Sequence, residues 1–312
     1  MDGLISFLAA AVVSGTPLLF ATLGGIMNEK VGNLNLGIEG MMLMGAVMGF
    51  MTAVKTNNVT ITIIVAALAG ALGALVYAFL TTTLKSNQVV TGLTLTIFGT
   101  GFSSMVGKGL IGLSTPENIK AAFSTMKIPV LGDIPFIGPI FFNQDLFVYF
   151  GYIVTILLFV YFSYTSFGLN TKAVGENPYA ADSASINVNL YKYINIILGG
   201  LLCGIGGAYL SLVYVPAWQE GVTAGRGWIA VALVIFSAWK PQRAILGAYI
   251  FGGLDILGFR LQGIQGINIS QYLIDMIPYV VTIIVLVVTS MNKNSKNKAP
   301  AALGISYFRE ER

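Results

Sequence analysis

Long apolar stretches, separated by short polar segments, fill most of this chain. A helix needs about 20 residues to cross the roughly 30 Å hydrocarbon layer of a bilayer, and most of these stretches reach or approach that length. The pattern predicts an all-α, polytopic membrane protein with about nine transmembrane helices, in a range of eight to ten. The predicted spans cover residues 4–27, 36–54, 59–80, 89–106, 146–164, 191–215, 228–239, 244–259 and 272–291.

Two parts of the chain do not fit a simple spanning helix. The segment 228–239 is only about 18 Å long as a helix, so we expect its flanks to extend it or neighbouring helices to bury it. The region 107–145 holds four prolines, Pro116, Pro129, Pro135 and Pro139, among apolar stretches. We expect short or re-entrant helices there.

The positions of the basic residues favour one orientation in the membrane. Lys293, Lys296, Lys298, Arg309 and Arg312 follow the last predicted span and favour a cytoplasmic C-terminus. Nine spans then place residues 28–35, 81–88, 165–190 and 240–243 inside and the N-terminus outside. Without the tail, the two sides carry equal numbers of basic residues. We expect a transmembrane domain over 1–291, with a cytoplasmic loop at about 165–190, and a basic cytoplasmic tail over 292–312.

Composition supports the membrane class and excludes several chemistries. Hydrophobic residues make up 55% of the chain and charged residues 10%, whereas soluble domains have nearer a quarter charged. The absence of histidine excludes a His-based triad, a His-containing zinc site and a His proton shuttle, and the single cysteine, Cys203, has no partner for an intrachain disulfide. Gly45/Gly49 and Gly200/Gly204 have the spacing of close helix contacts. The first span follows Asp2 instead of a basic region and stays apolar for too long before any cleavage site, so we expect it to be retained rather than removed as a signal peptide.

A polar island of about 25 residues lies between the spans 146–164 and 191–215. Asn177 is a good N-cap, and Pro178 suits the first turn of a short helix because its missing N–H would have no partner there. Ala180, Ala181 and Ala184 are expected to give that helix a smooth face. We expect such a helix to be a docking site that could move with its partner as a lever; the alternative is an ordinary solvated loop.

Two carboxylates are predicted to lie at membrane depth. A charged residue at the centre of a span costs about 2.5 to 3.5 kcal/mol on insertion scales, so Glu39 should face protein, a water-filled path or the interface. The alternative is that Glu39 ties the start of its helix to a neighbouring backbone or to Lys30. For Asp255, a role in the path and a pairing with a buried donor remain open.

Three motif blocks carry a resemblance to a known family. They are EKVGNLNLGIEGMMLMGA at 29–46; AVGENP at 173–178 with its continuation to 188; and GRGWIAVAL at 225–233, followed by WKP at 239–241 and GA at 247–248. This pattern resembles the permease subunits of bacterial ABC importers for simple sugars and nucleosides. The first block is most similar to the shorter permease of purine-nucleoside importers that use a lipoprotein binding protein.

The resemblance implies a non-catalytic subunit that forms half of a translocation path in the bacterial cytoplasmic membrane. The implied partners are a second, related permease, a cytoplasmic ABC ATPase, an extracytoplasmic substrate-binding lipoprotein and the lipid bilayer, with no nucleic acid. ATP and Mg would be bound by the ATPase and no cofactor by this chain, in which the phosphate-loop pattern GxxxxGK[ST] does not occur.

Two sets of functional residues are expected, the first from the resemblance and the second from the chemistry of the side chains. Coupling to the ATPase would run through the segment 173–188, with Gly175, Glu176, Asn177, Pro178, Ala180 and Ala181. The translocation path or gate would involve Asn35, Glu39, Phe98, Phe102, Tyr209 and Asp255, with Asn195 and Tyr214 as further candidates for contacts to a nucleoside. The alternative for the aromatic residues is packing or contact with lipid.

Other functions remain open at this point. The same machinery could import ribose or galactose. Broken helices together with Glu39 and Asp255 also suit an ion-coupled secondary transporter, which would work without an ATPase. A membrane scaffold without transport activity is the third alternative.

Overall fold

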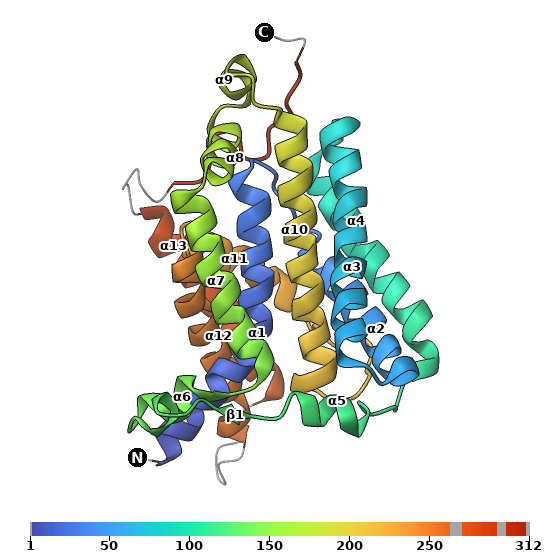
Figure 1. Ribbon diagram of the computed structural model, residues 1–312, viewed down its shortest axis with the longest axis vertical. Coiled ribbons are helices and arrows are strands. Elements are labelled where there is room, and N and C mark those ends of the chain that lie inside the picture. Colours follow the sequence, from blue (N-terminus) through green and yellow to red (C-terminus); the bar gives the residue numbers. More distant parts are fainter. Residues whose placement is uncertain (1, 263–269, 292–297, 310–312) are drawn as a thin grey trace.

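A single bundle of long helices forms the body of the protein (Figure 1). The computed structural model describes residues 2–262, 270–291 and 298–309. Each predicted span coincides with a helix. The long helices are α1 (Asp2–Lys30), α2 (Ile38–Thr56), α3 (Val59–Ala78), α4 (Gln88–Gly107), α7 (Leu146–Tyr164), α10 (Val188–Tyr209), α12 (Pro241–Gln262) and α13 (Gln271–Met291), and the short one is α11 (Arg226–Phe236).

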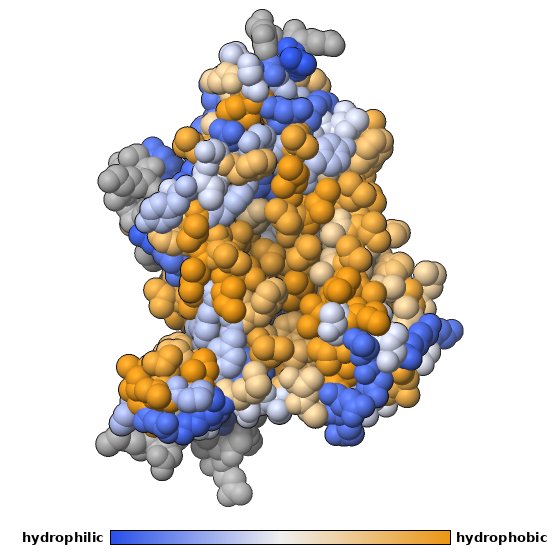
Figure 2. Space-filling view, in the orientation of Figure 1, coloured by the Kyte–Doolittle hydropathy of each residue, from blue (hydrophilic) through white to orange (hydrophobic). Residues whose placement is uncertain are grey.

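The bundle has the dimensions and surface of a multi-pass membrane protein. Within the described residues, six helices are long and apolar enough to cross a bilayer: α1, α2, α3, α4, α7 and α10. The π-helical turns η1 (Phe79–Thr83) and η4 (Leu210–Tyr214) extend α3 and α10. Figure 2 shows an apolar belt between two more polar ends. The total of nine crossings stays a prediction.

Small residues hold the centre of the bundle together. A Cβ atom on Gly45 would collide with the backbone of Gly204, and one on Gly207 would collide with the carbonyl of Met42. Gly70 packs in the same way against Gly200 and Gly204. In lipid there is little hydrophobic drive for helices to associate, so such close backbone contact supplies the packing energy instead. The prediction that Gly45, Gly200 and Gly204 mark helix contacts is confirmed.

The region 107–145 forms short elements at the N-terminal end of the bundle (Figure 1). They are η2 (Lys108–Leu110), α5 (Glu117–Ala122), β1 (Met126–Lys127), η3 (Leu131–Asp133), α6 (Ile137–Phe141) and β2 (Asn143–Gln144). The strands β1 and β2 are antiparallel, with Met126 opposite Gln144. The predicted short helices are confirmed.

The segments predicted to share one side of the membrane do gather at one end. The backbone N–H of Gly304 donates to the carbonyl of Gly32, and the Lys85 ammonium lies 5.7 Å from the centroid of the Tyr307 ring. The indole of Trp239 reaches the carboxylate of Glu29 at this end. The N-terminus lies at the opposite end (Figure 1). That the gathered end is cytoplasmic stays a prediction.

Candidate translocation and coupling sites

Between α1 and α2 the chain leaves the helical conformation while still inside the bundle. In lipid, irregular backbone is tolerated only where it is buried in protein or lines a cavity, because its polar groups need partners. Three buried or half-buried side chains from other helices supply partners here. The amide oxygen of Gln88 accepts from Leu34 N (2.7 Å), the Tyr77 hydroxyl donates to Leu34 O (2.6 Å), and the Thr96 hydroxyl donates to the Leu36 carbonyl (3.0 Å).

Asn35 lies in this non-helical segment and is buried. Its side-chain oxygen accepts from the backbone N–H of Gly37 at 2.8 Å, two residues ahead, which turns the chain into α2. The geometry shows a local, turn-forming contact for Asn35. Its predicted role in the path stays a prediction.

Glu39 joins the starts of two helices. Its Oε1 accepts from the Thr223 hydroxyl (2.6 Å) and from Gly225 N (2.9 Å), and its Oε2 accepts from Gly227 N (2.6 Å). The carboxylate therefore lies at the N-terminus of α11 as well as in the first turn of its own helix, α2, and both helix dipoles favour a negative charge there. Of the two interpretations of Glu39, the structure shows the tie to a neighbouring backbone.

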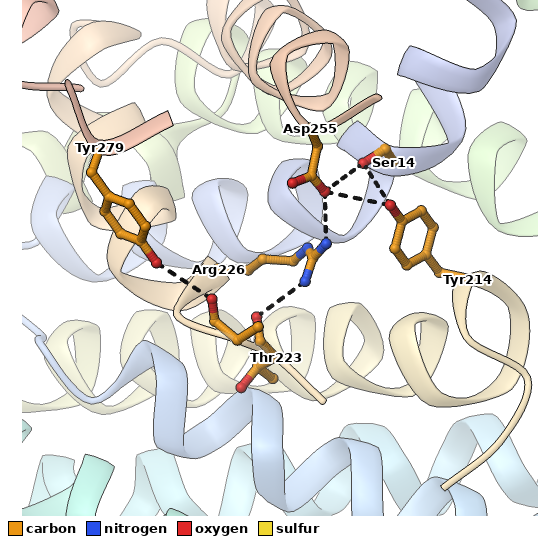
Figure 3. Close-up of polar contacts among 7 residues, drawn as sticks. Ser14, Tyr214, Thr223, Arg226, Asp255 and Tyr279 are labelled. Atoms are coloured by element: carbon orange, nitrogen blue, oxygen red, sulfur yellow. Dashed lines mark hydrogen bonds and ion pairs between the residues drawn. The ribbon is translucent and has the colours of Figure 1, made fainter. Parts of the chain in front are cut away.

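Asp255 is paired with a cation from another helix (Figure 3). The Arg226 Nη2 atom lies 2.6 Å from Asp255 Oδ2, with side-chain exposures of 13% and 29%. The hydroxyls of Ser14 (3.0 Å) and Tyr214 (3.4 Å) donate to the same oxygen, and the Arg226 guanidinium lies 5.2 Å from the Tyr214 ring centroid. The network links α1, η4, α11 and α12, and brings together two predicted residues, Asp255 and Tyr214.

Sequence reasoning missed Arg226, because the predicted span 228–239 begins two residues after it. In the structure Arg226 begins α11, where the flanking Gly225 adopts a left-handed backbone (φ 80°) and Gly227 packs against Glu39. The sequence around Arg226 could have indicated this pairing. Arg226 lies between two glycines just before a short apolar segment, and the next span contains one acidic residue, Asp255. Opposite charges at membrane depth are expected to pair.

Two further candidates for the path, Tyr209 and Asn195, are buried, and each forms hydrogen bonds with a neighbouring side chain. The Tyr209 hydroxyl donates to Asp145 Oδ2 at 2.9 Å, and Asp145 Oδ1 caps α7 by accepting from Phe147 N. Burial raises the pKa of the Asp145 carboxyl above its usual value. The Asn195 amide donates to the Thr171 hydroxyl at 3.2 Å and so links α10 to α8 (Ser166–Glu176).

Phe98 and Phe102 are paired with each other. Their rings stack at 6.2 Å between centroids on α4, and Phe98 is 57% exposed. Phe98 also lines an apolar cavity of about 330 Å³ together with Met44, Tyr77 and Leu95. Their helix, α4, packs closely against α2, because a Cβ atom on Gly99 would collide with the backbone of Gly40. The predicted role of the two phenylalanines in the path stays a prediction.

The predicted coupling segment forms two short helices, α8 and α9 (Pro178–Ser183), at the end opposite the N-terminus. Pro178 occupies the first turn of α9, and the Asn177 side chain caps the helix by accepting from Ala180 N at 3.0 Å, as predicted. Gly175 packs so tightly against the carbonyl of Lys30 that a Cβ atom would collide with it. Glu176 is exposed and accepts from Ala301 N at 3.2 Å.

The prediction that Ala181 shares the smooth outer face of this helix is wrong. Ala181 is 3% exposed and packs into the core, whereas Ala180 and Ala184 are exposed. Successive residues of a helix point about 100° apart, so Ala181 can face the core while Ala180 faces outward; Ala184 caps the end of the helix. The face open to a partner is therefore that of Ala180 and Ala184.

The three motif blocks meet in space. The first block contacts the second where Gly175 packs on the end of α1, and it contacts the third through Glu39 and Gly227. The Trp239 indole N–H donates to Glu29 Oε2 at 2.6 Å, which adds a second link between the first and third blocks. Among the described residues, no group of three or more Cys, Asp or Glu side chains is placed to hold a metal ion.

Comparison with known proteins identifies the class. The chain is 37% identical to TsgC13 of Haloferax volcanii, provisionally named a glucose ABC transporter permease protein, over 97% of each chain. It is 34% identical to the nucleoside ABC transporter permease protein NupC of Lactococcus lactis, over 97% of this chain and 96% of NupC. It is 32% identical to the guanosine ABC transporter permease protein NupQ of Bacillus subtilis, with the same coverage.

These relatives are permease subunits of ABC transporters, and the fold and motif blocks described above agree with that class. The model of the family described as the permease component of branched-chain amino acid transport systems matches residues 7–286. The chain belongs to this permease family.

Proposed function

We propose that this chain is a permease subunit of an ATP-driven importer of nucleosides. The observation that carries the substrate class is the similarity to NupC and NupQ, which extends over 96% of each of those proteins. Similarity over the whole chain supports a shared path rather than a shared local motif. Guanosine and related purine nucleosides are the first substrates to test.

A simple sugar is the second candidate, and one specific observation favours it. TsgC13, whose name refers to glucose, has the higher identity of 37%. A nucleoside consists of a base on a ribose, so both substrate classes offer sugar hydroxyls to hydrogen-bonding groups, and only the nucleoside offers an aromatic face. Uptake measurements separate the two.

In the proposed mechanism, a separate cytoplasmic ATPase binds and hydrolyses ATP and docks on α9. The exposed face of Ala180 and Ala184 offers a smooth contact at the end where the predicted inner segments gather. A second permease subunit completes the path, and a binding lipoprotein delivers substrate at the opposite end. ATP binding and hydrolysis then shift the population between inward-open and outward-open states through their different contacts with α9.

The junction around Glu39 supplies a rigid link for this movement. Because Glu39 holds the starts of α2 and α11 together, and Arg226 at the start of α11 holds Asp255 on α12, these three helices are joined by charged contacts. A shift at the coupling end can therefore reach the middle of the bundle through packed helices. Glu39, Arg226 and Asp255 are in this account positioning residues.

Uptake in a deletion strain tests the proposed substrate. The strain would be supplied with labelled guanosine, inosine, uridine, ribose, galactose and glucose, and the gene would be restored on a plasmid. We expect restored uptake of purine nucleosides, and none when the partner ATPase carries a phosphate-loop substitution. If the plasmid restored uptake of glucose, ribose or galactose but of no nucleoside, the substrate class would be simple sugars and the proposal would be wrong.

The ion-coupled alternative makes a different prediction. The purified chain in vesicles should then accumulate substrate when a sodium or proton gradient is applied, without any ATPase. We expect no accumulation under those conditions. Gradient-driven uptake by the chain alone would contradict the proposed dependence on ATP.

A further inference from the structure

Residues 298–309, here called the C-terminal strap, run across the coupling end of the bundle. Sequence reasoning treated this segment only as part of a basic tail. Its backbone pairs with two separate parts of the chain: Ala302 N donates to the carbonyl of Gly175 at 3.0 Å, and Gly304 N donates to the carbonyl of Gly32 at 3.2 Å. The strap therefore bridges the end of α8 and the segment that follows α1.

Side chains extend this contact to α9. Tyr307 is 5% exposed, and its ring centroid lies 5.1 Å from that of Tyr179 on α9. The Lys85 ammonium lies over the same Tyr307 ring, and Arg309 Nε lies 3.6 Å from Asp182 Oδ2 on α9. One buried aromatic side chain thus touches both α9 and the chain that leads into α4.

The strap holds α9 from the inside and leaves its outer face open. Tyr179 faces the strap, while Ala180 and Ala184 on α9 and its following turn remain exposed. A cavity of about 740 Å³ lies beside this contact, lined in part by Asp182, Asn187, Tyr307 and Arg309. A strap that blocked docking of the ATPase would cover the outer face of α9. This strap leaves that face open, so it does not act as an inhibitor of docking.

A helix as short as α9 needs such support. It has six residues, and isolated helices shorter than about 12 residues are marginal in water. Asn177, between α8 and α9, is in an extended conformation (φ −151°), so α9 does not simply continue α8. The orientation of α9 must therefore come from contacts with the rest of the chain.

We propose that the C-terminal strap is the positioning element of the coupling segment: it fixes the orientation of α9 relative to the end of α1, so that a movement of the ATPase on α9 reaches the bundle. This inference rests on the proposed function, in which α9 contacts the ATPase. The strap itself touches neither substrate nor ATP. Tyr307 is its central positioning residue.

The test compares Tyr307→Ala with Tyr307→Phe in the assembled transporter, at equal membrane abundance. Uptake of the transported substrate and ATP hydrolysis are measured on the same vesicles. We expect the Ala variant to lower uptake per ATP hydrolysed by about tenfold, because the buried ring that orients α9 is lost. The Phe variant keeps the ring and should stay close to the parent, and the substrate KM should change in neither.

A second variant keeps the test decisive if Tyr307→Ala is poorly inserted. A chain that ends at Asn297 lacks the whole strap and leaves every predicted span intact, and we expect the same loss of coupling. Unchanged uptake per ATP in either variant would overturn the inference, as would loss of the ATPase from the purified complex. A parent chain that never co-purifies with an ATPase would instead overturn the proposed function, so the two failures are distinguishable.

Discussion

Two short helices of this protein are held in place in different ways: α11 by the junction around Glu39, and α9 by the contacts of the coupling end. At the junction, the Glu39 carboxylate binds the start of α11, and Arg226 in that first turn binds Asp255. At the coupling end, backbone pairing and the edge-on contact of Tyr307 with Tyr179 hold α8 and α9. The first set of contacts is charged and inside the bundle. The second is largely neutral and lies at its surface.

This difference indicates which function each region can serve. Charged hydrogen bonds that are shielded from water are strong, and removing one partner leaves the other unsatisfied. At the coupling end the contacts are backbone pairs and one buried ring, and its partly exposed ion pair, Arg309 with Asp182, contributes little to stability. Changes at the junction should therefore affect the stability of the bundle, and changes at the coupling end should affect the transmission of movement.

The largest expected effect is that of Glu39→Gln. The new amide keeps one acceptor oxygen, and its NH2 group takes the place of the other. It then faces either Gly227 N or Gly225 N, and a backbone N–H cannot accept a hydrogen bond. We expect a loss of about 2 to 4 kcal/mol in stability and less protein in the membrane. Thermal unfolding in detergent measures the first effect, and quantitative blotting the second.

Glu117→Gln is the matched control for this prediction. Glu117 is an exposed glutamate on α5 that pairs with Lys120 at 2.9 Å, and an exposed pair contributes little to stability. We expect a change of about 0.5 kcal/mol or less. A Glu39→Gln variant that is as stable and abundant as the parent, yet transports poorly, would contradict the structural role. It would show instead that Glu39 acts in the translocation path.

A smaller effect is expected from the pair Arg226 and Asp255, because both side chains are partly exposed. Arg226→Leu and Asp255→Leu each leave one charge without its partner, at a cost of about 1 to 3 kcal/mol. The double variant removes both charges and should be less destabilised than the sum of the single variants by about 1 kcal/mol or more. Strictly additive losses would show that the two residues do not stabilise each other.

The smallest effects on the stability of the whole bundle are expected at the coupling end, where two adjacent alanines provide a sharp comparison. Ala181→Arg places a long cation in the core beneath α9 and should destabilise this helix by about 1 to 3 kcal/mol. Ala180→Arg extends into solvent, so chain stability should change by about 0.5 kcal/mol or less, while ATPase binding weakens. Hydrogen exchange over residues 178–184 and co-purification of the ATPase separate the two effects. If α9 were equally protected from hydrogen exchange in both variants, the assignment of Ala181 to the buried face and Ala180 to the exposed face would be wrong.

Local sequence signals predicted much of this architecture. The apolar runs predicted where the long helices lie, and Asn177 with Pro178 predicted the start of α9, because helix length and capping depend on neighbouring residues. The alternation of spans also predicted which segments gather at one end. These features need no knowledge of distant contacts.

The features that were missed depend on contacts between distant parts of the chain. The inward turn of Ala181 is set by the packing of a six-residue helix, whose own sequence permits several rotations. The pairing of Arg226 with Asp255 depends on α11 starting inside the bundle. The strap is too short to be recognised as a membrane span, and its burial follows from a fit to Gly32, Gly175 and Tyr179, which are far away in the sequence.

Cysteine crosslinking between α9 and the partner ATPase tests the central claim most directly. Cys203 is the only cysteine of the chain, so Cys203→Ala provides a background in which single cysteines are introduced at Ala180, Ala181 and Ala184. We predict efficient crosslinks to the ATPase from positions 180 and 184, and weak ones from the buried position 181. Absence of crosslinks from all three positions, while another loop at the same end crosslinks efficiently, would contradict coupling through α9.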